Sequence, residues 1–235
     1  KNKNLEDKEL KERVDRSDFF NWLDQNQERV QIIIHIGART DTAEFNRDLL
    51  WELNYDYSVK MFHKCIEYGL PLIYASSAAT YGKGENGYSD DHNVVGKLKP
   101  LNPYGESKNE FDKYVLGQPK KPFFWAGLKF FNVYGPNEYH KGRMANVVYH
   151  LYRQASETGK VKLFRSHDPK YKDGEQLRDF IYVKDVTAII QWLMEKRTKV
   201  NSGLYNVGTG RARTFLDVAN AVFKSLKKKE KIEFI

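Results

Sequence analysis

The sequence predicts an α/β fold built on a doubly wound parallel sheet. Residues 30–36 (VQIIIHI) are too uniformly apolar for a half-exposed strand and fit one that is buried on both faces of a parallel sheet. Residues 45–68 follow with apolar side chains at helical spacing, which predicts a long crossover helix. Strand-like and helix-like segments then alternate along the chain, and this order is typical of parallel strands joined by helices.

The first half of the chain keeps this alternation. The helix over 45–68 is expected to bury one stripe of side chains, namely Leu49, Leu53, Tyr57, Met61 and Cys65. A strand over 72–75, a helix over 103–116 and a strand over 123–131 complete the order strand, helix, strand, helix, strand.

The second half interrupts the alternation, so we assign it mainly to a smaller α/β region. Its pattern predicts a helix over 144–157, strands over 161–164, 179–183 and 204–207, and a helix from residue 184. Thr214 and Asp217 have the spacing of a capping box and introduce one more amphipathic helix. We therefore expect one domain over 1–135 and a second over 136–235, with segments of the second returning to the first.

Composition narrows the classes of function. The 235 residues are 40% hydrophobic with a mean hydropathy of −0.70, and no apolar run approaches the length of a membrane span, so no membrane partner is expected. Much of the net charge of +8 lies in residues 224–231 (KSLKKKEK), and without a base-reading element no nucleic-acid partner is expected. The single cysteine, Cys65, excludes an internal disulfide, and no metal site is expected. The chain begins without a methionine or a secretory signal, which favours a cytoplasmic product whose beginning is absent here.

A tyrosine and a lysine stand one helical turn apart in the segment N-P-Y-G-E-S-K (102–108). Asparagine caps helices and proline suits a first turn, so Tyr104 and Lys108 are expected on the same face of a helix. An ammonium near a phenol stabilises the phenolate and lowers its pKa, which lets the pair move a proton to or from a hydroxyl. The same spacing also occurs in ordinary helices with a surface tyrosine and lysine, so the context decides.

That context is the segment S-S-A-A-T-Y-G (76–82), which follows a buried strand. A serine at the carboxyl end of a strand in an α/β sheet lies where ligands bind, and its hydroxyl can hold a substrate oxygen beside the phenol. A serine-rich turn without function is the alternative. The order of strand, serines and capped Tyr-x-x-x-Lys helix is far more specific than either part.

These segments, followed by F-N-V-Y-G-P (131–136), resemble the extended short-chain dehydrogenase/reductases that act on nucleotide-activated sugars. The resemblance covers nearly all of the chain and implies a Rossmann-like dinucleotide-binding domain followed by a substrate-binding region. It also implies a catalytic triad of Ser77, Tyr104 and Lys108, where Ser77 is preferred over Ser76 because it stands directly before A-A-T-Y-G. No G-x-G-x-x-G occurs, so we expect that the N-terminal glycine-rich unit, which receives a pyrophosphate in this fold, is missing from the sequence.

The resemblance also implies a cofactor, NADP, with NAD as the alternative. The segment I-G-A-R-T (36–40) occupies the turn that contacts the cofactor in the family. The cofactor-binding residues that the resemblance implies are Lys1, Arg16, Ile36, Gly37, Ala38, Arg39, Thr40, Asn54, Lys108, Val133 and Lys141.

The segment H-K-G-R-M-A (140–145) is similar to the ADP-heptose 6-epimerases of this family, where the lysine is a second acid/base partnered against the tyrosine. Lys141 therefore joins the catalytic residues, and a solvated loop lysine is the alternative. Arg178 is expected to bind a diphosphate through its guanidinium, and otherwise to pair with Asp179 at a strand edge. The substrate-binding residues that the resemblance implies are Ser77, Asn132, Arg143, His150, Phe164 and Arg178.

The implied activity is the interconversion of ADP-D-glycero- and ADP-L-glycero-D-manno-heptose by oxidation and re-reduction at C6. Family membership further implies a cytoplasmic homo-oligomer that supplies heptose for the lipopolysaccharide inner core. Three alternatives stay open. A UDP-sugar 4-epimerase would need the triad but not Lys141, a 4,6-dehydratase would carry an acidic residue where Ala78 and Ala79 stand, and a noncatalytic dinucleotide-binding protein would be expected to lose the triad.

Overall fold

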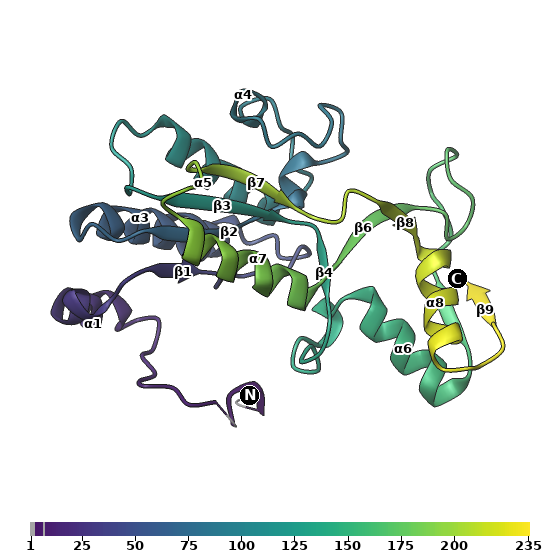
Figure 1. Ribbon diagram of the computed structural model, residues 1–235. Coiled ribbons are helices and arrows are strands. Elements are labelled where there is room, and N and C mark those ends of the chain that lie inside the picture. Colours follow the sequence, from purple (N-terminus) through teal and green to yellow (C-terminus); the bar gives the residue numbers. More distant parts are fainter. Residues whose placement is uncertain (1–2, 7) are drawn as a thin grey trace. The chain divides into compact units, whose positions relative to one another are not determined.

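A four-stranded sheet organises the first part of the computed structural model, which describes residues 3–6 and 8–235 (Figure 1). Its strand order is β1-β2-β3-β7, with β1 (Ile33–His35), β2 (Leu72–Ser77), β3 (Trp125–Phe130) and β7 (Gly203–Val207). β1 and β2 pair in parallel with Ile33 opposite Leu72, and all six side chains of β2 are buried. The predicted α/β fold with a parallel sheet is confirmed.

Helices precede the first strand of this sheet and connect the others. In chain order they are η1 (Lys3–Leu5), α1 (Phe19–Asn26), η2 (Gln27–Arg29), α2 (Arg47–Leu50), η3 (Trp51–Asp56), α3 (Tyr57–Glu67), η4 (Ala78–Tyr81), α4 (His92–Val95) and α5 (Pro103–Gly117). α3 and α5 pack against each other, and α5 also packs on β2. The largest apolar core lies between these helices and the strands and includes Phe20, Leu23, Met61, Phe62, Cys65, Leu72, Tyr74, Phe111, Val115, Trp125 and Leu204.

The long helix predicted over 45–68 is present as the consecutive elements α2, η3 and α3. Met61 and Cys65 are buried as predicted, but the first three positions of the buried stripe differ from the prediction. The six-residue η3 is a π-helix. Along residues 47–58 the buried positions are Leu50, Asn54 and Ser58 rather than Leu49, Leu53 and Tyr57. Two polar side chains can occupy this stripe because they are hydrogen-bonded: the Ser58 hydroxyl donates to the carbonyl of Asn54 at 2.5 Å, and the Asn54 amide bonds outside the helix. π-Turns of this kind occur frequently at functional sites.

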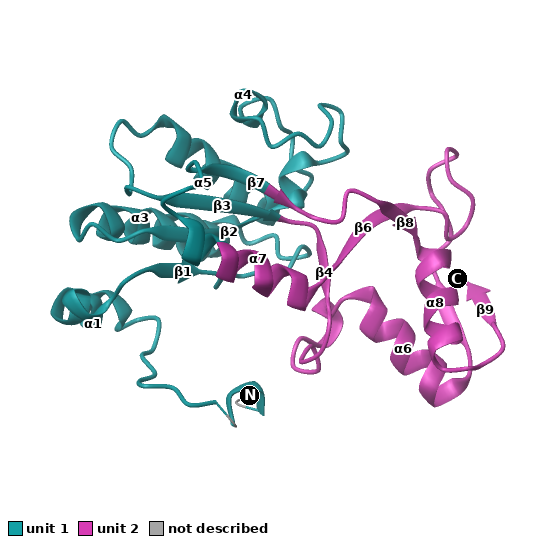
Figure 2. Cartoon of the chain, viewed as in Figure 1, with its two compact units in different colours: residues 1–129, 193–205 teal, residues 130–192, 206–235 magenta. Residues whose placement is uncertain are grey.

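The chain divides into two compact units, coloured separately in Figure 2. Unit 1 comprises residues 1–129 and 193–205, and unit 2 comprises residues 130–192 and 206–235. Unit 2 contains a three-stranded sheet in the order β4-β6-β8 and a two-stranded sheet of β5 and β9. Its remaining elements are helical, and the full set is β4 (Asn132–Tyr134), η5 (Gly142–Met144), α6 (Val147–Thr158), β5 (Val161–Leu163), β6 (Leu177–Tyr182), most of α7 (Val183–Lys196), β8 (Ala212–Thr214), α8 (Phe215–Ser225) and β9 (Ile232–Phe234).

The predicted capping box at the start of α8 is confirmed. Thr214 Oγ1 accepts the amide of Asp217 at 2.9 Å, and the Asp217 carboxylate accepts the amide of Thr214 at 2.9 Å. The short strands β4, β8 and β9 were not predicted, because three-residue strands carry too little periodicity to be distinguished from loops. The helices α1 and α4 were not predicted either. Among the described residues, no helix is long and apolar enough to cross a membrane.

Candidate active site

The carboxyl end of β2 positions the serine of the predicted triad. Ser77 is the last residue of β2 and caps η4, where its Oγ accepts the amide of Ala79 at 3.1 Å. The side chain is buried, and its hydroxyl lies near enough to the phenol of Tyr104 to act on the pKa of that group. β2 and α5 therefore bring together two residues that are separated by 27 positions in the sequence.

α5 carries the other two members of the triad. Asn102 caps this helix by accepting the amide of Gly105 at 2.8 Å, and Pro103 occupies its first turn, as predicted from the sequence. Tyr104 is half-buried and Lys108 is buried one turn later, with its Nζ donating to the carbonyl of Ala75 at 2.8 Å.

Electrostatics in the triad differ from the expectation. Burial raises the pKa of the Tyr104 phenol, and the nearby hydroxyl of Ser77 opposes this by less. Burial also lowers the pKa of Lys108 to about 8, against the opposing charge of Asp112. The depressed phenol pKa expected from the Tyr-x-x-x-Lys spacing is therefore not found in this structure, because burial is the largest effect on both groups.

Asn54 fixes the loop that the sequence assigned to the cofactor. Its side-chain oxygen accepts the amide of Arg39 at 2.8 Å, and its side-chain nitrogen donates to the carbonyl of Arg39 at 2.9 Å. The same nitrogen donates to the hydroxyl of Ser107 on α5 at 3.2 Å. The buried Asn54 amide thus ties residues 37–40, η3 and the triad helix together in unit 1.

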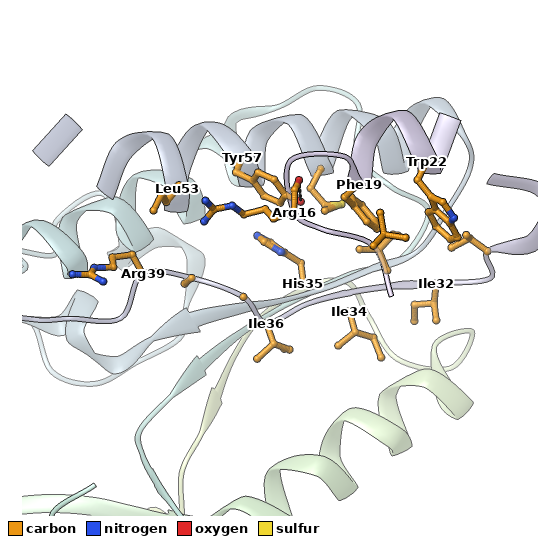
Figure 3. Close-up of a pocket in the computed structure, with 16 residues that line it drawn as sticks. Arg16, Phe19, Trp22, Ile32, Ile34, His35, Ile36, Arg39, Leu53 and Tyr57 are labelled. Atoms are coloured by element: carbon orange, nitrogen blue, oxygen red, sulfur yellow. Dashed lines mark hydrogen bonds between the residues drawn. The ribbon is translucent and has the colours of Figure 1, made fainter. Parts of the chain in front are cut away.

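An open pocket of about 690 Å³ runs along β1 (Figure 3). β1 is an edge strand of the sheet, and Ile34 and Ile36 are 39% and 42% exposed. A Cβ placed on Gly37 would meet no atom within 4 Å, so the backbone at this end of the pocket is open to a ligand. The predicted cofactor residues that line the pocket are Arg16, Ile36, Gly37, Ala38 and Arg39, whereas Thr40 lies exposed just beyond and Lys1 lies outside the described residues.

His35 of β1 also lines the pocket. Its Nε2 lies 2.9 Å from the hydroxyl of Ser58, and burial, helped by the charge of Lys108, lowers its pKa to about 4. The imidazole is therefore neutral at physiological pH.

In unit 2, a buried glutamate organises the loop that contains Lys141. Glu138 is 5% exposed and accepts the amide of Gly135 at 3.2 Å and the amide of Asn146 at 2.8 Å. Lys141 Nζ lies 3.4 Å from the same carboxylate, and the lysine side chain is 45% exposed. The ammonium is thus oriented by Glu138 while part of it faces solvent.

The other predicted residues of unit 2 lie on several elements. Asn132 Nδ2 donates to the carbonyl of Asp179 at 3.2 Å. The side-chain Nδ2 of Asn146 donates to the carbonyl of Val133 at 3.0 Å. Arg143 is exposed in η5, His150 is half-buried on α6, and Phe164, which follows β5, is 78% exposed.

Arg178 does not form the alternative ion pair with Asp179. Its guanidinium donates to the carbonyl of Leu177 at 2.7 Å and lies 6.0 Å from the ring centroid of Phe215. The Asp179 carboxylate instead accepts from the hydroxyl and amide of Thr209 and from the amide of Gly210.

Sequence reasoning missed several charged residues. Arg211 and Arg213 line a pocket of about 490 Å³ in unit 2 together with Asp217. In unit 1, Asp112 and Lys129 form an ion pair that is completely buried. A lysine within an otherwise apolar strand (WAGLKF) was the available signal for this pair, because a buried ammonium requires a buried partner. No group of three or more metal-ligating side chains occurs in the part of the chain that the structure describes.

The chain is similar to known proteins over most of its length. Residues 3–208 match the model of the family described as "NAD dependent epimerase/dehydratase family". The chain is 45% identical to the ADP-L-glycero-D-manno-heptose-6-epimerase of Fusobacterium nucleatum over 98% of this chain and 70% of that protein.

Two solved structures extend the comparison. The ADP-L-glycero-D-manno-heptose-6-epimerase of Helicobacter pylori is similar with a TM-score of 0.76 and 32% identity, over 94% of this chain and 66% of that one. The UDP-glucose 4-epimerase of Thermus thermophilus in complex with NAD is similar with a TM-score of 0.76 and 27% identity, over 99% of this chain and 74% of that one. The chain spans 66% to 74% of the length of these three proteins.

Proposed function

Because the chain belongs to the NAD dependent epimerase/dehydratase family, we propose that it is a nucleotide-sugar epimerase that inverts C6 of ADP-D-glycero-D-manno-heptose. The observation that carries this proposal is the placement of the Ser77 hydroxyl near the phenol of Tyr104, one helical turn from the buried ammonium of Lys108. Relatives that bear the name ADP-L-glycero-D-manno-heptose-6-epimerase support the choice of substrate, since they are 37% to 48% identical to this chain.

When bound, a nicotinamide dinucleotide, NADP or alternatively NAD, would supply the hydride acceptor and donor that oxidation and re-reduction at C6 require. The residues that would hold it in unit 1 are those of the 36–40 loop, Asn54 and Lys108. The open backbone at Gly37 and the apolar surface of β1 fit a flat, partly apolar ligand of this kind. The Thermus thermophilus neighbour in complex with NAD supports the same choice.

The side chains handle the proton of the C6 hydroxyl. Ser77 holds the substrate oxygen beside the phenol of Tyr104, which takes the hydroxyl proton as hydride leaves C6, so that the substrate becomes a 6-aldehyde. Lys108 favours the phenolate through its positive charge. Because burial raises the pKa of Tyr104, the phenol must first lose its own proton to solvent before it can accept the substrate proton, and the charge of Lys108 favours that loss.

Inversion requires an acid/base group on each of two sides of the C6 oxygen. Once the aldehyde has turned, hydride returns to its other face, and a second group must supply the proton to the oxygen. We assign this role to Lys141, whose ammonium is held by Glu138 and is partly accessible. The complete protein is expected to act as a cytoplasmic homo-oligomer in heptose supply for lipopolysaccharide.

The test is incubation of the protein with ADP-D-glycero-D-manno-heptose and NADP while C6 inversion is followed by NMR. Tyr104→Phe should lower turnover by about a hundredfold or more without loss of fold, because a positioned acid/base contributes on this scale. Tyr114→Phe, on the same helix but outside the triad, is the matched control and should keep normal turnover. Inversion of C4 in UDP-glucose, with no reaction of the heptose, would replace the proposal with the 4-epimerase alternative.

A further inference from the structure

The ion pair between Asp112 of α5 and Lys129 of β3 lies in the interior of unit 1. Lys129 Nζ is 2.7 Å from Asp112 Oδ2, and neither side chain has any exposed surface. A buried pair of this kind is a poor source of stability, because removing two charges from water costs several kcal/mol per ion and apolar replacements are often equally stable. The arrangement therefore calls for a role other than holding the fold together.

The contacts of the pair lie on both sides of Ser77. Asp112 Oδ2 accepts the hydroxyl of Ser76 at 2.6 Å, directly before Ser77 in β2. Lys129 Nζ donates to Thr80 Oγ1 at 2.9 Å, and the Thr80 hydroxyl donates to the carbonyl of Ser77 at 2.8 Å. The residue before Ser77 and the turn after it are thus both fixed to one buried ion pair.

Asp112 also lies one helical turn beyond Lys108, and its charge opposes the effect of burial on that lysine. The Asp112 carboxylate is shared, because Lys129 contacts it directly at 2.7 Å. The other groups around Lys108 carry no compensating negative charge. They are the carbonyl of Ala75 on β2, the neutral His35 of β1, and the phenol of Tyr104 on its own helix.

We propose that the Asp112–Lys129 pair is a positioning element of the Ser77–Tyr104–Lys108 centre, which fixes the direction of the Ser77 hydroxyl and sets the charge on Lys108. This inference rests on the proposed function, because it assumes that the triad is the reacting centre. Within the pair the two residues act in opposite directions on Lys108. The carboxylate favours the ammonium form, whereas the ammonium of Lys129 weakens that support by neutralising the carboxylate.

The test compares two single variants by the pH dependence of turnover. Since turnover requires a charged Lys108, it should fall as the pH rises through the pKa of that lysine, which is about 8 in the parent. This fall in turnover is the alkaline limb of the pH profile. Asp112→Asn should move the alkaline limb to lower pH by about one unit, the usual scale for loss of a nearby opposite charge. Lys129→Met should move it to higher pH. Glu110→Gln is the matched control, because Glu110 forms a pair of the same length, 2.7 Å, with Lys113 on the exposed face of the same helix.

A second readout separates this inference from the proposed function. In protein labelled with ¹³C at the lysine ε-carbons, the resonance of Lys108 is identified by its loss in Lys108→Met, and its titration should move in the same two directions. If the titrations move but the parent inverts no heptose, the inference survives and the proposed function fails. If the heptose is inverted but neither variant moves the limb or the titration, the pair is only structural and the inference fails.

The test still decides the question if Asp112→Asn fails to fold. Should Asp112→Asn be unable to fold, Lys129→Met decides alone, because Asp112 then keeps hydroxyl donors from Tyr74 and Ser76 as well as the charge of Lys108. A limb that moves to higher pH supports the proposal. An unmoved limb overturns it.

Discussion

At the scale of the residue, Glu138 determines how Lys141 can be tested. The glutamate accepts the amides of Gly135 and Asn146 in addition to contacting the lysine, so the loop keeps two of its hydrogen bonds when the ammonium is removed. A substitution of Lys141 should therefore report on its chemistry rather than on the shape of the loop.

We expect Lys141→Met to block C6 inversion and yet to retain hydride transfer between the cofactor and a 6-aldehyde analogue presented on the side of Tyr104. The two half-reactions separate because each requires its own proton donor on its own side of the substrate. Parallel assays of C6 inversion and of aldehyde dismutation measure both. If the lysine only binds the diphosphate, KM rises while both half-reactions remain at saturation. Equal loss of both would favour the 4-epimerase alternative.

His35 predicts a loss of stability in acid. Its pKa is about 4 in the folded protein against 6.5 for the free side chain, so between these values only the unfolded chain takes up the proton. The contribution of His35 is complete above pH 6.5 and declines as the pH falls toward 4, by about 2 kcal/mol at pH 5. Urea unfolding of His35→Asn at pH 7 and pH 5 should show a smaller acid loss than the parent. The exposed His167 provides the control, since His167→Asn should leave the acid loss unchanged.

At the scale of the element, the contact between α5 and η4 decides whether Tyr104 meets Ser77. A Cβ placed on Gly105 would lie 2.8 Å from the carbonyl oxygen of Ala79 and 3.0 Å from Pro100 Cβ. Only glycine allows the two backbones to approach this closely. The glycine in N-P-Y-G-E-S-K is thus part of the geometry that the triad requires.

Gly105→Ala should force α5 away from η4, with a cost of about 1 to 3 kcal/mol in unfolding free energy and a marked loss of turnover. Gly117→Ala near the other end of the same helix is the control. There a Cβ meets no atom within 4 Å, so alanine should stabilise the helix by up to about 1 kcal/mol and leave turnover unchanged. Thermal unfolding and turnover of both variants check the prediction, which is wrong if the two alanines behave alike.

Prediction from sequence succeeded where local signals were strong. The cap at Asn102, the proline after it and the serines at the end of β2 each carry their own signal, so α5 and the position of Ser77 could be predicted. Within the buried stripe of α2 to α3, Met61 and Cys65 were predicted correctly, but the three earlier positions were predicted one residue out of place. Leu49 and Leu53 follow an ordinary helical period, and nothing in the composition of the segment reveals the π-turn that buries Asn54 instead.

The Asp112–Lys129 pair could not be predicted from the sequence, for a different reason. It depends on which side chain of β3 faces α5, and this follows from tertiary packing rather than from either segment alone. The pKa of Tyr104 was predicted in the wrong direction for the same reason, because helical spacing describes proximity to Lys108 but not burial. The predicted roles of the site residues in unit 2 stay predictions.

At the scale of the whole molecule, unit 1 depends on a strand that follows most of unit 2 in the sequence. β7 lies beside β3 and contributes Leu204, which is 3% exposed in the main apolar core. Next to it, the amide of Trp125 donates to the hydroxyl of Ser202 at 3.0 Å, and the amide of Leu204 donates to His92 Nε2 at 3.1 Å. β7 is therefore an integral part of the sheet.

A chain that ends at residue 200 should consequently fail to fold unit 1 cooperatively. Tryptophan fluorescence, to which Trp125 (4% exposed in the intact sheet) contributes, should show no sharp urea transition in this truncated form. A chain that ends at residue 230 loses only β9, the partner of β5 in unit 2, and should keep the transition of unit 1. A sharp transition in the shorter chain would contradict the assigned role of β7.

The late position of β7 also has a consequence for synthesis on the ribosome. Between the end of β3 at Phe130 and the start of β7 at Gly203 the chain must be extended by 72 residues. At about 5 to 20 residues per second this takes about 4 to 15 s. During that interval the outer edge of β3 presents unpaired backbone groups and apolar side chains, a template on which other strands can add. The nascent chain is thus most exposed to aggregation, and most dependent on chaperones, after its triad has been made and before its sheet is complete.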